Sequence, residues 1–178
     1  MKKVFFIRWK SNSISLAQKI ESELDAKIIL WTAKPEHISK IRAHSGSQYY
    51  LDDVEAIREP KPSFLKMNHI IPQEVIDKTQ SFKESTILMM DRMDINNSFS
   101  RDLREVLFEQ LVSKSYALCR ELKPDLILYP ETPHLVYDYV LYEMAKILNI
   151  KNLLFERTFF ANLQIVASIS DFEYREEK

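Results

Sequence analysis

The chain has 178 residues, of which 46% are hydrophobic and 29% are charged, a composition typical of one soluble globular domain. Lys and Arg number 25 against 26 Asp and Glu, and the resulting net charge of −1 argues against nucleic acid as a partner. Gly46 is the only glycine, which excludes the glycine-rich motifs of self-contained Rossmann dehydrogenases, P-loop enzymes and α/β-hydrolases.

The cysteine content and the apolar runs bear on where the protein works. Cys119 is the only cysteine, so an intrachain disulfide and a cysteine-based zinc site are both excluded, and a reducing, cytoplasmic location is expected. The apolar run 4–7 stops at Arg8 and is too short for a signal peptide. No run approaches the roughly 20 apolar residues that span a bilayer, so any membrane association is expected to be peripheral.

Strands that alternate with helices are predicted for the first fifty residues. Residues 3–7 are β-branched and aromatic without a helical period, which predicts a strand. The polar segment 11–13 can cap a helix that carries an apolar stripe at helical spacing. The pattern then predicts a strand at 27–31, a helix at 35–43 and a short strand at 49–50.

The middle of the chain gives weaker signals. Residues 44–67 contain the single glycine and two prolines, and apart from the short strand at 49–50 they predict no regular element. Residues 72–78 predict a turn of helix. The apolar tetrapeptide 87–90 stops at a charged pair, and we interpret it as a strand, although its length alone fits either element.

A long helix is predicted in the C-terminal half. Apolar residues recur between 99 and 122 at steps of three and four, and the helix should begin at Ser98 or Ser100 and end before Pro124. A strand at 125–129 follows, after which Thr132 should cap the next helix with Pro133 in its first turn. The remaining predicted features are the end of that helix near residue 148, a left-handed cap at Asn149, and strands at 152–155 and 163–167.

These alternating elements predict an α/β fold, namely a doubly wound, mainly parallel, Rossmann-like sheet in a single domain that covers residues 1–178. We expect five or six strands with helices on both faces, and strands 3–7 and 125–129 at the centre. Ligands of such sheets bind at the carboxyl ends of the strands. The candidate site residues follow predicted strands: Arg8, Asn12, Asp91, Arg92, Glu131, His134, Glu156 and Arg157.

The strongest candidates are Glu131 and His134. In the first turn of a helix capped by Thr132, the helix dipole would disfavour imidazolium and leave His134 able to accept a proton. Glu131 could orient that ring or contact a sugar hydroxyl, and Arg8 could hold a carboxylate or phosphate through two hydrogen bonds. The alternative is structural: Glu131 caps backbone amides and His134 is solvated.

Ion pairs are the equivalent alternative for the charged pairs Glu156–Arg157 and Asp91–Arg92. The other three histidines, His37, His44 and His69, have no acidic or histidine partner at the spacing of metal ligands. We therefore expect surface or loop roles for them, and no metal site.

The sequence from 123 to 134, Lys-Pro-Asp-Leu-Ile-Leu-Tyr-Pro-Glu-Thr-Pro-His, is followed by a helix and then by Leu-Leu-Phe-Glu-Arg-Thr. This pattern resembles the N-terminal domain of GT-B-type glycosyltransferases, in particular proteins of capsular and surface polysaccharide biosynthesis. It is also similar to the N-terminal half of nucleotide-sugar epimerases of the same fold.

The resemblance implies an acceptor-side domain that binds a saccharide acceptor, with His134 or Glu131 as the base that deprotonates an acceptor hydroxyl. The nucleotide-sugar donor would be a substrate bound mainly by a second domain, and no cofactor is implied. Because the chain ends at Lys178, the resemblance implies part of a longer two-domain protein and an inactive isolated chain.

A second hypothesis keeps the fold and removes the catalysis. In a non-catalytic α/β binding or interaction domain, Glu131 and Glu156 would be structural. A carboxylate and an imidazole that converge in an open cleft favour the glycosyltransferase, whereas a flat, filled strand edge favours the interaction domain.

Overall fold

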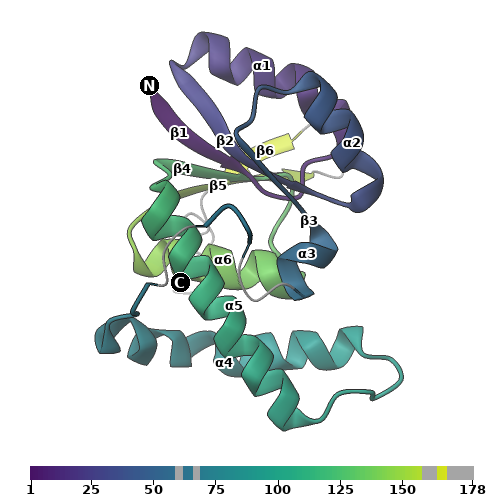
Figure 1. Cartoon of the computed structure of the whole chain (residues 1–178), viewed down its shortest axis with the longest axis vertical. Helices are drawn as coiled ribbons and strands as arrows, with labels where there is room; N and C mark the ends of the chain where they lie inside the picture. The colour runs from purple at the N-terminus through teal and green to yellow at the C-terminus, as the bar shows by residue number, and fades with distance from the viewer. Residues whose placement is uncertain (59–61, 66–68, 158–163, 168–178) are drawn as a thin grey trace, which may run out of the picture. The chain divides into compact units, whose positions relative to one another are not determined.

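The structure is a computed structural model, and it describes residues 1–58, 62–65, 69–157 and 164–167. The chain forms two compact units (Figure 1). The first unit, which contains the sheet, comprises residues 1–52, 124–133 and 150–178, and the second, which is helical, comprises residues 53–123 and 134–149. Each unit has its own buried side chains.

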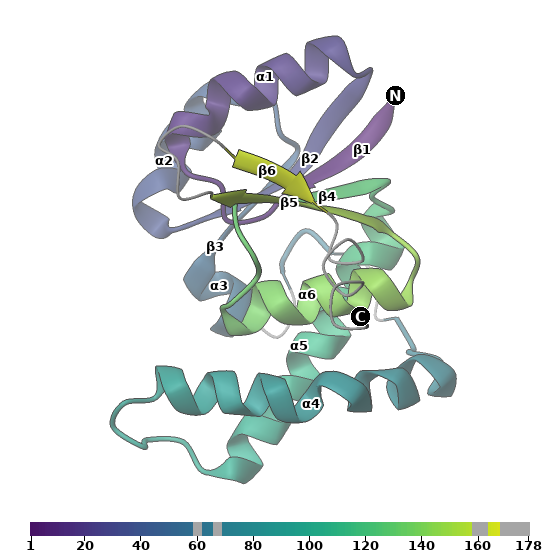
Figure 2. The same ribbon diagram turned by 180° about the vertical axis from the view of Figure 1, so that it is seen from behind.

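The first unit is built on a six-stranded sheet in the order β3-β2-β1-β4-β5-β6. Its first five strands are parallel, and β6 pairs antiparallel to β5, beside which it lies in Figure 2. The order runs outward from β1 in both directions, which is the doubly wound α/β arrangement that the sequence predicts. The strands are β1 (Lys2–Phe6), β2 (Ala26–Ala33), β3 (Tyr49–Asp52), β4 (Leu126–Tyr129), β5 (Lys151–Arg157) and β6 (Gln164–Ala167).

The predicted central strands are confirmed: β1 and β4 are parallel neighbours in the middle of the sheet, with Phe5 opposite Ile127. Almost every residue of β2 is buried, as expected of a strand covered on its faces. Phe6 and Trp31, whose rings lie 5.0 Å apart, form the centre of this core.

Helices α1 (Ile14–Glu23) and α2 (Pro35–His44) lie on one face of this sheet (Figure 1). Both were predicted, and Ala17, Ile38 and Ile41 bury their apolar faces in the same cluster as β1 and β2. The predicted cap at 11–13 differs, because these residues form a short 3-10 helix, η1 (Ser11–Ser13), and Ser13 makes no side-chain cap hydrogen bond.

The second unit consists of α3 (Asp53–Arg58), α4 (Gln73–Met93), α5 (Arg101–Leu122) and α6 (Val136–Ile147). The last three pack on one another, and the ring of Phe82 contacts Phe108 and Tyr139 edge-on with centroids 5.7 and 6.2 Å apart. The buried ammonium of Lys114 donates to the carbonyl of Ala56 at 2.6 Å, which connects α5 to α3.

The long predicted helix is confirmed as α5. Ser100 caps its start, because the Ser100 hydroxyl accepts a hydrogen bond from the Leu103 amide at 3.4 Å. Lys123 ends it in the left-handed conformation with φ of 52°, one residue before Pro124.

The strand predicted at 87–90 is wrong, because these residues lie inside α4. The buried residues of α4 recur at helical steps from Val75 through Phe82 to Ile87 and Met90, and this face decides the element. Leu88 is 57% exposed, so the apolar tetrapeptide is one turn of an amphipathic helix that begins at the predicted turn 72–78.

The start of α6 also corrects the sequence analysis. The helix begins at Val136, after Leu135, so Thr132 is not its N-cap and His134 precedes the helix instead of lying in its first turn. The buried apolar face of the helix starts at Val136, which explains the later start. The dipole argument for a neutral His134 therefore does not apply.

Among the described residues, no helix has the length and apolar character to cross a membrane.

Candidate functional site

The turn after β1 is held firmly by its neighbours in the sheet. Arg8 has φ of 62°, a left-handed conformation that is costly for any residue but glycine, and its amide donates to the Thr32 hydroxyl of β2 at 2.8 Å. The buried indole of Trp9 donates to the carbonyl of Leu128 in β4 at 2.9 Å, and that of Trp31 donates to the carbonyl of Trp9 at 2.8 Å. These hydrogen bonds fix the direction in which Arg8 leaves the strand.

The structure brings together two of the predicted site residues here. The Arg8 guanidinium (Nη1) lies 3.7 Å from a carboxylate oxygen of Glu131, which follows β4. At this distance the two groups form an ion pair but no hydrogen bond. Side-chain exposure is 12% for Arg8 and 41% for Glu131, so a nearly buried cation lies beside a half-exposed carboxylate.

The position of this pair in the sheet matters for function. β1 is connected onward to β2 on one side and lies beside β4 on the other, so the strand order reverses between β1 and β4. Ligands of doubly wound sheets bind at this switch point, outside the carboxyl ends of the strands. Arg8 and Glu131 therefore occupy the position at which this fold binds ligands.

A serine and a histidine form a second polar contact at the same edge. The Ser11 hydroxyl in η1 lies 3.3 Å from Nδ1 of His37, which is in the first turn of α2, after β2. Both side chains are half-buried. We expected only a surface or loop role for His37; its place directly after a predicted strand was the signal that could have included it.

Asn12 lies in the same 3-10 helix and is exposed. Its side-chain carbonyl accepts a hydrogen bond from the Ser13 hydroxyl at 3.5 Å. A substrate-binding role for Asn12 stays a prediction.

In the second unit, Arg92 and His134 are brought together through the backbone. The Arg92 guanidinium at the end of α4 donates to the main-chain carbonyl of His134 at 3.1 Å. Both side chains are exposed. This contact fixes the chain before α6, and the catalytic role of the His134 imidazole stays a prediction.

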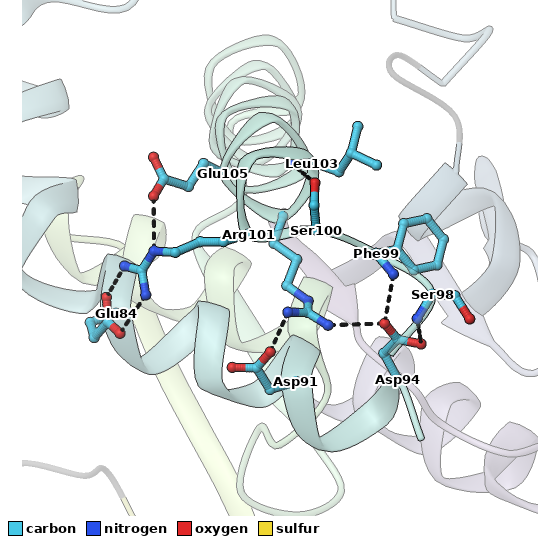
Figure 3. A network of polar contacts seen from close by, with 10 residues as sticks. Glu84, Asp91, Asp94, Ser98, Phe99, Ser100, Arg101, Leu103 and Glu105 are labelled. Atoms are coloured by element: carbon cyan, nitrogen blue, oxygen red, sulfur yellow. Dashed lines mark hydrogen bonds and ion pairs between the residues drawn. The ribbon is translucent and has the colours of Figure 1, made fainter. Parts of the chain in front are cut away.

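Asp91 has a different partner from the one that its sequence suggests. It forms an ion pair with Arg104 of α5, whose guanidinium also donates to Asp94 at 2.9 Å (Figure 3). The Asp94 carboxylate also accepts hydrogen bonds from the amides of Ser98 and Phe99, both at 2.9 Å. These two amides first, and Arg104 after them, lower the pKa of Asp94 below its ordinary value.

The remaining predicted pair, Glu156 and Arg157, ends β5. Their backbone pairs with Ile165 and Gln164 of β6, and their side chains lie outside the part of the chain that the structure describes. The described residues contain no group of three His, Cys, Asp or Glu side chains that could hold a metal ion.

Comparison of the chain with protein-family models, with curated proteins and with solved structures gives no significant match.

Proposed function

We propose that the carboxyl edge of β1 and β4 binds a polyhydroxylated acceptor, and that the chain is the acceptor-side half of a sugar-nucleotide-dependent glycosyltransferase for surface or capsular polysaccharide. The observation that carries this proposal is the contact of Arg8 with Glu131 at the point where the strand order reverses. The resemblance of residues 123–158 to the GT-B N-terminal domain supplies the reaction class.

The chemistry asked of Glu131 is proton transfer. As an acceptor hydroxyl oxygen forms its bond to the anomeric carbon of the donor, the bond from that carbon to the nucleotide phosphate breaks, and the hydroxyl proton passes to the Glu131 carboxylate. Arg8 contributes a positive charge beside the carboxylate, at a place that is fixed because the Arg8 amide donates to Thr32. The nucleotide leaves with the electron pair of the broken bond on its phosphate oxygen.

Two features favour Glu131 over His134 as the base. Glu131 follows a central strand and has a charged partner that orients its carboxylate. His134 precedes α6 and therefore lacks the place in the first helical turn on which its prediction as a base depended. We keep Asn12, Glu156 and Arg157 of the sheet unit as candidates for contacts with the sugar or its nucleotide, and the catalytic role of His134 and the substrate-binding role of Arg92 stay predictions. We also propose a cytoplasmic location with at most peripheral membrane contact.

The alternative function uses the same contact without catalysis. In a non-catalytic α/β binding or interaction domain, the ion pair of Glu131 with Arg8 would be structural, and so would Glu156. The two functions differ in what a longer protein containing this chain does after binding, because only the glycosyltransferase consumes donor.

Calorimetric titration of the 178-residue chain with a panel of saccharides and nucleotide-sugars tests the proposal. We expect a saccharide to bind, nucleotide-sugars to bind weakly, and no transfer, because a base without a positioned donor gives no proximity effect. Glu131→Gln should lower saccharide affinity about tenfold, which corresponds to about 1.4 kcal/mol. Glu84→Gln is the matched control, since Glu84 is also an exposed carboxylate paired with an arginine.

In a longer protein that contains this chain, Glu131→Ala should lower turnover by roughly two to four orders of magnitude if Glu131 is the general base. Efficient transfer by the 178-residue chain alone, or unchanged saccharide affinity in Glu131→Gln, would reject the proposal.

A further inference from the structure

The connection between α4 and α5 and the first turns of α5 expose large apolar side chains. Ile95 is 92% exposed, and Phe99, Leu103 and Val106 are 57%, 54% and 50% exposed. Scattered apolar residues on a surface are ordinary, but these four belong to one short segment. Leu103 and Val106 lie three residues apart on one face of α5, and Phe99, which comes directly before the N-cap Ser100, lies on the same side as Leu103 (Figure 3). We call these three residues the α5 stripe.

The segment that carries this stripe is held in one conformation. Asp94 accepts hydrogen bonds from the amides of Ser98 and Phe99, and Arg104 connects Asp94 to Asp91 across the turn (Figure 3). The same view shows Phe99 and Leu103 on the side of α5 opposite to Glu105. A turn fixed by a polar network displays its apolar side chains in a defined geometry, which lowers the entropy cost of binding a partner.

Two carboxylates flank the stripe on one side. Asp102 and Glu109 lie seven residues apart on α5, so they share a face, and both are exposed. No ion pair among the described residues involves either of them. The neighbouring acid Glu105 is already engaged by Lys83 and Arg101. A partner of this surface must therefore offer apolar side chains to the stripe and positive charge to the two carboxylates beside it.

We propose that the α5 stripe binds a basic amphipathic helix of another protein. A helix with apolar residues at steps of three and four can pack along the stripe, and lysines or arginines on its flank would meet Asp102 and Glu109. A second copy of this chain is disfavoured, because a two-fold contact would bring the acidic flanks of both copies together. An anionic membrane surface is disfavoured by the same carboxylates.

A pair of synthetic peptides tests this proposal on the full chain. The first is a 14-residue peptide, on the order of four helical turns, with leucine at steps of three and four and lysine elsewhere. The second carries glutamate in place of lysine. We expect the lysine peptide to bind in a fluorescence-anisotropy titration, to weaken as salt is raised, and to bind at least about tenfold more tightly than the glutamate peptide.

Point variants then locate the binding surface. Leu103→Ser should weaken the lysine peptide about tenfold or more, and Asp102→Asn with Glu109→Gln about two- to fivefold. Leu24→Ser is the matched control, because Leu24 is 58% exposed on the other unit and should not affect binding. Circular dichroism confirms that each variant is folded.

Three outcomes would overturn the proposal. They are equal affinity for the two peptides, equal weakening by Leu24→Ser and Leu103→Ser, and sedimentation that shows a dimer lost in Leu103→Ser. The last result would assign the stripe to a second copy of this chain.

Discussion

Two arginines of this protein face carboxylates in opposite ways. In the helical unit, Arg104 is enclosed between Asp91 and Asp94, and Asp94 also accepts two backbone hydrogen bonds. In the sheet unit, Arg8 lies 3.7 Å from Glu131, whose carboxylate is 41% exposed. The first cluster gives Asp94 three hydrogen bonds and leaves its side chain 12% exposed, whereas the second leaves the Glu131 carboxylate accessible to another molecule.

This difference separates a structural ion pair from a candidate site. The Arg104 cluster stabilises the turn between α4 and α5. The contact of Arg8 with Glu131 is an ion pair without a hydrogen bond, and it occupies the position where this fold binds ligands, on a residue in a strained backbone conformation. Strain and loose pairing together are what we expect where binding, and not stability, has shaped the residues.

The largest effect should come from the turn between α4 and α5. Arg104→Ala leaves Asp91 and Asp94 facing each other without their cation, and the free energy of unfolding should fall by roughly 2–3 kcal/mol. Urea denaturation followed by circular dichroism measures this change. A loss below about 0.5 kcal/mol would show that the network is a surface feature, and the contrast with Arg8 would fail.

A matched pair of substitutions at Arg8 gives the next effect. Both Arg8→Ala and Arg8→Gly remove the ion pair, but only glycine adopts a φ of 62° at little cost. The glycine variant should therefore be more stable than the alanine variant by about 1 kcal/mol in the same denaturation experiment. Equal stability of the two variants would mean that the backbone at Arg8 is not strained.

Acid should affect the Asp94 network selectively. Because the amides of Ser98 and Phe99 hold the pKa of Asp94 below its ordinary value, its stabilising effect is present above about pH 4 and is lost as the pH falls below that value. The melting temperature of the wild type should exceed that of Asp94→Asn at pH 7, and the difference should shrink below pH 4. A difference that stays constant to pH 2 would contradict this assignment.

Glu131→Gln should give the smallest change in stability. A half-exposed carboxylate at 3.7 Å from its partner contributes less than about 0.5 kcal/mol to folding. Thermal unfolding of the two proteins side by side measures the change. A larger loss would make Glu131 a structural residue and would favour the non-catalytic alternative.

The sequence predicted the sheet well because its strands carry strong local signals. Continuous apolar runs in β1, β2, β4 and β5, and the alternation with helices, indicated the doubly wound order that the structure has. It misassigned residues 87–90, since an apolar tetrapeptide does not distinguish a strand from one turn of α4. The division into two compact units has no composition shift or linker to reveal it.

The candidate site was predictable only in part. The rule that ligands bind at strand ends selected Arg8 and Glu131, and the structure places them in contact. The rule did not reveal that Arg104, twelve residues beyond Arg92, would be the partner of Asp91, because that contact depends on how α4 meets α5. His37 was missed because a lone histidine gives no signal until Ser11 is placed beside it.

The two tryptophans of this chain offer the most direct test of the proposed site. Trp9 directly follows Arg8, and the indole of Trp31 donates to the carbonyl of Trp9. These two residues give the only indole N–H signals of the chain in a nitrogen-15 NMR spectrum. During titration with a saccharide that binds, the Trp9 signal should shift in the wild type. At a saccharide concentration equal to the wild-type Kd, the shift should be largely lost in Glu131→Gln. A bound saccharide that leaves both indole signals unmoved, or moves them equally in the variant, would place binding elsewhere and contradict the account.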